Sequence, residues 1–391
     1  MFGILFWMSV VILLYVYLGY PLLIAVLAQG RKKQVFRSDF QPFVTLLFAA
    51  HNEEKVIVKK LANTLALKYP RERLQVIVAD DGSTDGTAEI VRSYRDQGID
   101  LVSFDERRGK LAALKDTVKD VHGEIILFSD ADNLYSPDAV AETVKYFSDP
   151  TIGAVSGGRN VIGETSLGKA EGFYWRYEEF IKRQESRLDS CVGVAGDLFA
   201  IRKKLYVPPP EGTINDDFYM ALCILKQGYR VVYAPEARSY HPVAGSEQGE
   251  AERRTRMTAG RFQSIFSAGT VLPFQRPIVL WQIISHKYMR LLLPFAMISA
   301  LLANILAIFS HGGVNGPAWL ILADPYNWIF LVLQGLFYMV AAMGMKFKLS
   351  GLLGKVLYIP TFLLNSNMAA LRGFYRYLTS RQSVIWKKAT R

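Results

Sequence analysis

Residues 4 to 28 contain no charged side chain, and this uncharged run restricts the possible folds more than any other feature of the chain. A helix rises about 1.5 Å per residue, so about 20 apolar residues cross the hydrocarbon layer of a membrane. The run therefore predicts an N-terminal transmembrane anchor over residues 1–30. A cleavable signal peptide is the alternative, but no basic segment precedes the run and no small-residue cleavage site follows it.

Basic residues follow the run directly, at positions 31 to 33. The positive-inside rule then places the next part of the chain in the cytoplasm. The two cysteines, Cys191 and Cys223, would be reduced there, so we expect buried thiols and no disulfide. The net charge is +11, and the basic residues recur beside apolar segments. No nucleic-acid-binding motif occurs in the sequence. The charge therefore favours membrane lipids and pyrophosphate over nucleic acid as partners.

The chain is 51% hydrophobic and 21% charged, a composition too apolar for one soluble domain and too charged for a wholly membrane-embedded one. Between residues 40 and 265 short apolar runs alternate with helical segments. Such alternation predicts an α/β domain with a mostly parallel, Rossmann-like sheet whose ligands bind at the carboxyl ends of the strands. The expected strands are 43–50, 74–80, 100–104, 124–132, 153–158 and 229–237, and the expected helices are 53–67, 86–97 and 109–120.

The C-terminal part contains further apolar segments. Residues 270–289 mix apolar and polar positions and predict an amphipathic helix in the membrane interface. Spanning helices are expected at about 290–310 and 326–345. Residues 349–371 are interrupted by Pro360 and three polar residues, which favours a re-entrant or interfacial segment over a fourth crossing that would export the basic tail 372–391. We therefore expect transmembrane or re-entrant helices over 290–371.

Acidic residues follow the expected strands. Asp130 and Asp132 end one of them, and residues two apart on a strand point to the same side, so both carboxylates could bind one Mg²⁺ or Mn²⁺ ion. Asp80 and Asp81 end the preceding strand. Turns and helix caps use the same residue types, so helix capping and turn formation remain alternatives for these pairs.

Several other residues fit a nucleotide site. His51, Asn52 and Glu53 lie beside the Asp80 strand end, where polar side chains could bond a base or ribose. Lys110 begins a helix and could meet the nucleotide as a point charge, although a solvated lysine explains it equally well. Asp217 begins another expected helix; it either caps that helix or acts as the general base, and we favour the base.

Arg253 and Arg256 lie three apart on an expected helix, hence on one face of it. Guanidinium groups match phosphate oxygens in a two-pronged geometry, so the pair could hold a diphosphate. A basic helix lying on the membrane surface is the alternative.

In this order the motifs resemble the family 2 glycosyltransferases, inverting enzymes with the GT-A fold. The resemblance is carried by AHNEE, ADDGSTDGT, GK-x-x-AL, SDAD and GVAGDLFAIR, and extends nearly end to end. It implies a GT-A domain followed by interface and transmembrane helices. It also implies roles for individual residues: uridine contacts from Asp80 and Asp81, a nucleotide contact from Lys110, metal and diphosphate contacts from Asp130 and Asp132, and a general base at Asp217.

The membrane members that look similar are the cellulose, hyaluronan and poly-N-acetylglucosamine synthases, which carry QxxRW before their interface helices. Here the aligned residues run from Arg253 to Met257, so the arginine is retained at Arg256 while the glutamine and tryptophan are absent. This departure puts processive polymerisation in doubt. The SHKYMR and NSNMAALRGFYRYL stretches and Trp386 look similar to a bacterial exopolysaccharide-associated subgroup of the family.

The resemblance implies a UDP-sugar-dependent hexosyltransferase in the bacterial inner membrane, with Mg²⁺ or Mn²⁺ as cofactor and a glycan or lipid-linked acceptor. A separate export subunit would be a possible partner. One alternative is an enzyme that adds a single sugar to a polyprenyl phosphate or glycolipid. Another is a nucleotide-binding scaffold without catalysis, which would not need the full set of carboxylates.

Overall fold

The computed structural model describes residues 1–31, 33, 38–162, 166–242, 247–310, 316–347 and 351–382. Sequence-based predictions for Lys32 and for the tail from residue 383 onward lie outside these ranges. The described chain forms two compact units. We call residues 24–245 and 263–283 the sheet unit, and residues 1–23, 246–262 and 284–382 the helical unit.

The sheet unit is built on one mixed sheet of eight strands in the order β3-β2-β1-β4-β7-β6-β8-β5. The strands β3, β2, β1 and β4 are mutually parallel, β7 runs antiparallel to both of its neighbours, and β6 is parallel to β8. The strand bounds are β1 Val44–Ala50, β2 Leu74–Asp81, β3 Ile99–Phe104, β4 Ile125–Asp130, β5 Leu134–Tyr135, β6 Ile152–Ile162, β7 Leu198–Arg202 and β8 Arg230–Pro242.

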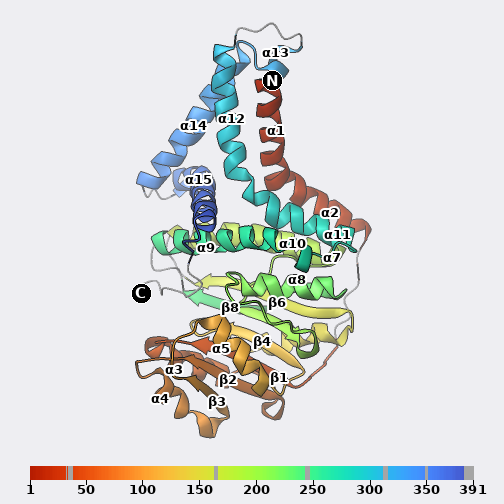
Figure 1. Ribbon diagram of the computed structural model, residues 1–391, viewed down its shortest axis with the longest axis vertical. Helices are drawn as coiled ribbons and strands as arrows, with labels where there is room; N and C mark the ends of the chain where they lie inside the picture. Colours follow the sequence, from red (N-terminus) through yellow and green to blue (C-terminus); the bar gives the residue numbers. More distant parts are fainter. Residues whose placement is uncertain are drawn as a thin grey trace. The chain divides into compact units, whose positions relative to one another are not determined.

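Helices cover this sheet (Figure 1), with α5 packed on β1 and β2, α4 beside β3, and α6, α7 and α8 against β8. Almost every residue of β1 and β2 is buried, as expected for parallel strands covered on both faces. The expected alternation of strands and helices is confirmed. The helix bounds are α3 Glu54–Leu65, α4 Thr87–Arg92, α5 Lys110–Thr117, α6 Ala139–Val144, α7 Ser166–Leu188, α8 Asp216–Lys226, α10 Ala268–Val271 and α11 Pro277–Ile283.

The helical unit contains α1 (Phe2–Leu14), α12 (Leu293–Phe309), α13 (Ala318–Ile321), α14 (Tyr326–Lys346) and α15 (Gly351–Leu378), together with most of α9 (Glu247–Phe266). The helix α1 packs along α12, which in turn contacts α14 (Figure 1). Three buried alanines of α12, at positions 300, 303 and 307, lie beside Phe6 of α1. Small residues allow helices to approach closely where lipid, rather than water, surrounds them.

Two helical stretches in the described ranges are long and apolar enough to cross a membrane: Phe2–Gly30, which comprises α1, a π-helical turn at Tyr15–Gly19 and α2 (Tyr20–Gly30), and Tyr326–Lys346. A third candidate is the pair Pro277–Leu291 and Leu293–Phe309, whose axes differ by 55°. Length and apolar composition therefore mark the chain as a membrane protein, while the number of crossings stays a prediction.

Two C-terminal segments differ in detail from the sequence expectation. Pro360 lies inside the continuous helix α15 and does not interrupt it. Membrane helices accommodate a proline where neighbouring groups bind the carbonyl that it leaves without a donor. In the segment expected to be amphipathic, Gln282 and Ser285 are buried. Gln282 donates to the Glu185 carbonyl, so its amide binds protein instead of water.

Candidate functional site at the strand ends

The carboxyl ends of β1, β2 and β4 meet at one edge of the sheet. Ala50 of β1 pairs with Asp80 of β2, and Ala49 of β1 pairs with Asp130 of β4. The two aspartates therefore stand at the same edge, on either side of β1. Ligands of open α/β sheets bind at such an edge.

The loops that follow β1 and β2 are bonded to each other. Asn52, with a φ of 53°, donates its backbone N–H to Ser83 Oγ at 3.0 Å and accepts the Thr84 N–H at Oδ1 at 2.8 Å. The Glu53 N–H donates to Thr87 Oγ1 at 2.8 Å. Two of the residues assigned to the nucleotide by sequence, Asn52 and Glu53, thus also fix the shape of the strand-end loops.

The Asp81 carboxylate holds the segment that enters α5. Its two oxygens accept the backbone N–H groups of Arg108 and Gly109, each at 2.8 Å, and its own carbonyl lies 2.8 Å from His51 Nδ1. The neighbouring Gly82 has a φ of +65°, and a Cβ there would lie 2.7 Å from the backbone of the same segment. Asp81 therefore has a structural partner for each oxygen, whether or not it also meets a nucleotide.

Asp80 differs from its neighbour. It is 1% exposed, and Ser103 Oγ donates to its Oδ2 at 3.1 Å. Its Oδ1 is buried and has no hydrogen-bond partner among the described residues. A buried oxygen without a partner costs free energy, so a donor group supplied by a ligand would be favourable there.

Asp130 forms an ion pair with Lys110, the first residue of α5. Burial would raise the pKa of Asp130, but Lys110 outweighs that effect and holds the pKa below its usual value. Burial likewise lowers the pKa of Lys110, and the carboxylates of Asp130, Asp216 and Asp217 more than reverse it. Both groups are therefore charged near neutral pH.

The strand argument for Asp132 does not hold, because β4 ends at Asp130. Asp132 lies in the following turn, where strand alternation does not set the direction of a side chain. Its assignment as a metal ligand stays a prediction that now depends on the conformation of this turn.

Asp216 and Asp217 are the first two residues of α8. Asp217 is partly buried and its Oδ1 accepts its neighbour's backbone N–H, from Phe218, at 2.7 Å. Gly196, in the turn before β7, packs closely on it: a Cβ at Gly196 would lie 3.2 Å from Asp217 Oδ2. The glycine therefore keeps open the space beside the predicted base.

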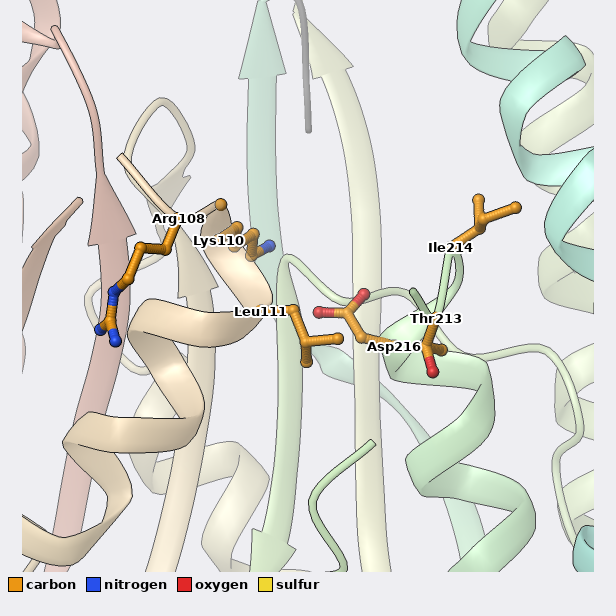
Figure 2. Close-up of a pocket in the computed structure, with 7 residues that line it drawn as sticks. Arg108, Lys110, Leu111, Thr213, Ile214 and Asp216 are labelled. Atoms are coloured by element: carbon orange, nitrogen blue, oxygen red, sulfur yellow. The ribbon is translucent and has the colours of Figure 1, made fainter. Parts of the chain in front are cut away.

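A small pocket lies between the start of α5 and residues 213–216. Figure 2 shows Lys110 and Asp216 in its lining, with Arg108 directed away from Asp216. Its volume of about 40 Å³ holds a few water molecules and is too small for a sugar nucleotide. The lining residues are Arg108, Gly109, Lys110, Leu111, Thr213, Ile214 and Asp216.

Arg253 and Arg256 lie on the part of α9 that belongs to the helical unit. Arg253 donates to both oxygens of Glu250, at 2.8 and 2.9 Å. Burial would raise the pKa of Glu250, but Arg253 and Arg254 lower it to about 2. Arg253 is therefore tied to a carboxylate on its own helix, and its assignment to a diphosphate stays a prediction.

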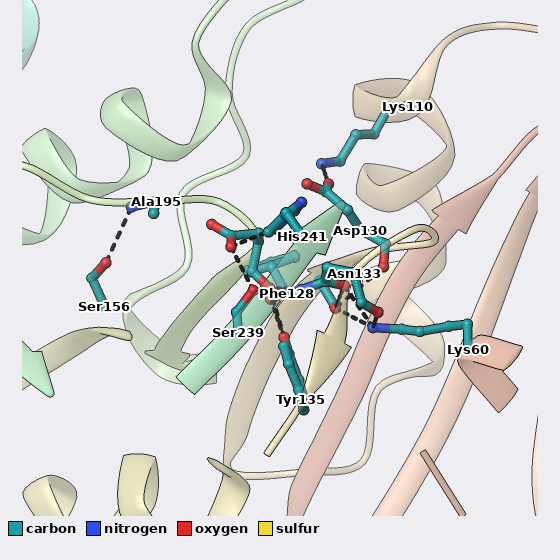
Figure 3. A network of polar contacts seen from close by, with 12 residues as sticks. Lys60, Lys110, Phe128, Asp130, Asn133, Tyr135, Ser156, Ala195, Ser239 and His241 are labelled. Carbon is teal, nitrogen blue, oxygen red and sulfur yellow. Dashed lines mark hydrogen bonds and ion pairs between the residues drawn. The ribbon is translucent and has the colours of Figure 1, made fainter. Parts of the chain in front are cut away.

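Sequence reasoning missed a buried polar network beneath Asp130. Its members include Lys60 of α3, Asn133, Asp197 and His241 (Figure 3). His241 Nε2 lies 2.7 Å from Asp197 Oδ2, and although burial raises the pKa of Asp197, the histidine is the main reason that it lies well below its usual value. A signal was present in the sequence: Asp197 follows a glycine within the quoted GVAGDLFAIR motif.

The donor atoms present fit a divalent ion only in part. Within the described ranges, no three His, Cys, Asp or Glu side chains lie close enough to bind a metal ion by themselves. Enzymes that bind nucleotides with Mg²⁺ commonly use one or two carboxylates and take the remaining oxygens from phosphate and water. Two carboxylates, as predicted at Asp130 and Asp132, would therefore be enough for an ion that arrives with a diphosphate.

Comparison with known proteins supports the sequence resemblance. Residues 45–207 match the family described as glycosyl transferase family 2. Poly-beta-1,6-N-acetyl-D-glucosamine synthase of Staphylococcus aureus strain COL is 30% identical over 237 residues, which cover 59% of this chain and 57% of that protein. The enzyme of the same name from Staphylococcus epidermidis is 27% identical over 225 residues, or 56% of this chain and 54% of that protein. The chain thus spans little more than half the length of these curated relatives.

Among solved structures, the mannosyltransferase PcManGT from Pyrobaculum calidifontis, in complex with GDP-Man and Mn²⁺, is similar over 97% of this chain and 100% of that chain. The TM-score is 0.71 and the sequence identity 24%. The GT-A α/β fold expected from the sequence is thereby confirmed.

Proposed function

We propose that the chain is a member of glycosyl transferase family 2, whose model matches residues 45–207, and that it moves a sugar from a UDP-sugar to a glycan or lipid-linked acceptor. The proposed location is the cytoplasmic face of a bacterial inner membrane, in exopolysaccharide synthesis. The similarity to poly-N-acetylglucosamine synthases and the two apolar helical stretches support this proposal. The chain's partial coverage of those synthases leaves their substrates a proposal for this protein.

The observation that carries the proposal is the electrostatic environment of Lys110. Its ammonium is paired with Asp130 at the end of β4, and it lines the same small pocket as Asp216, the first residue of α8. This proximity supports the proposal that the strand end assigned to the diphosphate and the helix start assigned to the base form one site. Such a site can hold the donor and activate the acceptor together.

In the proposed reaction an acceptor hydroxyl attacks C1 of the donor sugar, and the bond between C1 and the diphosphate oxygen breaks. Asp217 takes the hydroxyl proton, and the nucleoside diphosphate leaves from the opposite face, which inverts C1. Asp130 and Asp132 would hold a divalent ion, which when bound neutralises charge on the leaving group. Lys110 is proposed to stabilise the same phosphates.

The donor is tested directly with the full-length chain purified in detergent. Release of nucleoside diphosphate is measured with a panel of UDP-sugars and with GDP-mannose, each in Mn²⁺, in Mg²⁺ and in EDTA. We expect release with one UDP-sugar in the presence of metal. Release with GDP-mannose and with no UDP-sugar would mean that the donor carries guanosine and not uridine. Absence of release with every donor would contradict the proposal.

A pair of neighbouring variants tests the base. We expect Asp217→Asn to lower transfer by at least about 100-fold, because acid-base catalysis contributes about 10² to 10⁴ in rate, and to leave UDP affinity nearly unchanged. Asp216→Asn, one residue earlier on the same helix, serves as the matched control and should lower transfer far less. A larger loss of transfer in Asp216→Asn than in Asp217→Asn would assign the base to Asp216.

Single addition to a lipid carrier is the second candidate, and Met257 is the observation that favours it, since the synthases resembled here have tryptophan at that position. Product length separates the two functions. Labelled donor would give a ladder of lengthening polymer from a synthase. A lipid-specific enzyme would give one product that extracts into organic solvent.

A further inference from the structure

Lys60 of α3 is 1% exposed, and its ammonium is fully bonded inside the protein. It donates to Ser129 Oγ at 2.7 Å, to Asn133 Oδ1 at 2.7 Å and to the Asn133 carbonyl at 3.0 Å. An ammonium has three N–H donors, and these three acceptors can pair with all of them. The acceptors lie immediately before and immediately after residues 130–132.

The surroundings of Lys60 fix the ammonium in place. The ring of Tyr135 lies 4.5 Å from Nζ and that of Phe48 lies 5.2 Å away. Aromatic faces attract a cation at these distances. The same helix adds a second attachment, because Asn63 accepts the Tyr135 N–H at 2.8 Å and donates to its carbonyl at 3.0 Å. One face of α3 therefore holds the chain on both sides of the turn.

Asn133 extends this attachment to the other half of the sheet (Figure 3). It is 0% exposed, and its Nδ2 donates to the Asp197 carbonyl at 2.7 Å and to Ser239 Oγ at 3.1 Å. Ser129 Oγ donates to Asn133 Oδ1 at 2.9 Å. The turn between β4 and β5 is thus connected to α3, to the start of β7 and to β8 through buried hydrogen bonds.

Stability alone does not account for this lysine. Burial lowers its pKa from 10.5 to about 7, although the carboxylates of Asp130 and Asp132 act in the opposite direction. Burying an ammonium costs free energy, and its hydrogen bonds offset that cost only in part. The benefit of Lys60 is therefore expected mainly in the conformation of the turn.

We propose that Lys60 is a positioning residue that holds the Asp130–Asp132 turn in the conformation needed to bind a divalent cation together with a nucleoside diphosphate. The inference rests on the proposed function, because it assumes that this turn binds the metal and diphosphate. Lys60 acts through Ser129 and Asn133 and does not itself touch the ligand. Loss of such supporting partners typically lowers metal affinity by about 10- to 100-fold.

The test compares Lys60→Met with Lys182→Met in the full-length chain. Lys182 is a second buried lysine of the sheet unit, 4% exposed, beside the rings of Trp175 and Tyr233. Calorimetry measures the affinity for UDP, or for the diphosphate that the donor panel identifies, with saturating Mn²⁺ and with EDTA. The ratio of the two affinities reports the coupling between metal and diphosphate.

We expect Lys60→Met to lower that ratio by about 10- to 100-fold while the affinity in EDTA stays near the wild-type value. The thermal midpoint should fall, because the buried Asn133 carbonyl loses the donor that Lys60 supplies. Lys182→Met should keep the wild-type ratio. Ser129→Ala removes one acceptor of Lys60 with little change in volume, and we expect a smaller fall in the same ratio. It decides the question if Lys60→Met does not fold.

Two outcomes contradict the inference in different ways. Equal ratios for wild type, Lys60→Met and Ser129→Ala would overturn it and leave the proposed function intact. A fall in the EDTA affinity as large as the fall in Mn²⁺ would also overturn it, because Lys60 would then shape the nucleotide site as a whole. A wild-type protein that binds no nucleoside diphosphate with Mn²⁺ would overturn the proposed function and this inference together.

Discussion

Burial of the Lys60 ammonium makes the stability of the sheet unit depend on pH. Its pKa is about 7 in the folded protein and 10.5 in the unfolded chain, so the unfolded chain binds the proton more tightly. Stability should therefore rise as the pH increases from 7 to 10.5, by up to about 1.4 kcal/mol per pH unit from this group. Below pH 7 both states are protonated and the group adds no slope.

Thermal unfolding of wild type and Lys60→Met at pH 6, 7.5 and 9 measures this effect. The wild-type midpoint should rise relative to that of the variant as the pH increases, because the variant lacks the titrating amine. Curves that stay parallel over this range would show that the ammonium remains protonated in the folded protein.

At the same scale, sequence reasoning located the residues at strand ends better than it located their supports. Asp80 and Asp130 could be placed at one edge because parallel strands share their carboxyl ends. Asp132 could not be oriented, since β4 ends two residues earlier than the apolar pattern indicated. Lys60 was missed because a lysine on an amphipathic helix is usually exposed, and its acceptors at Ser129 and Asn133 come from a distant part of the chain.

At the scale of elements, the Asp81 carboxylate couples the end of β2 to the start of α5 through the N–H groups of Arg108 and Gly109. In Asp81→Asn one of these donors would face an amide NH₂. These bonds are partly buried, so an unpaired donor costs less than the about 1 to 3 kcal/mol of a fully buried one, and we expect a modest loss of thermal stability. The position of Lys110 should also change, with weaker UDP binding as the result.

The exposed Asp100 of β3 provides the matched control, and Asp100→Asn should leave both thermal stability and UDP affinity unchanged. Circular dichroism and calorimetry measure the two quantities. If Asp81→Asn keeps its stability and loses only UDP affinity, the carboxylate acts mainly on the nucleotide, as the family resemblance implies.

Elements with strong patterns were predictable and their interruptions were not. The strands β1 and β2 could be predicted from their apolar runs, because both faces of these strands are buried. The N-terminal helical stretch could be predicted because its uncharged run is long enough to cross a membrane. Pro360 predicts a break in the helix, but α15 continues through it. Whether a helix passes a proline depends on local hydrogen bonds that composition does not reveal.

At the scale of the whole molecule, the distribution of charge predicts the orientation in the membrane. Basic residues follow the first apolar run, while the chain between α12 and α14 contains no lysine or arginine. The positive-inside rule therefore predicts that the sheet unit lies in the cytoplasm and this connection outside. The division into an anchor, a catalytic domain and C-terminal membrane helices remains a prediction that depends on this orientation.

Two serine-to-cysteine variants test the orientation. Ser310 follows α12 and Ser93 follows α4, both are exposed, and the native Cys191 and Cys223 are buried, so background labelling should be low. A membrane-impermeant maleimide should label Ser310→Cys in intact cells and Ser93→Cys only after the membrane is opened. Labelling of both in intact cells, or of Ser93→Cys alone, would place the site outside the cytoplasm, where sugar nucleotides made in the cytoplasm could not reach it without transport.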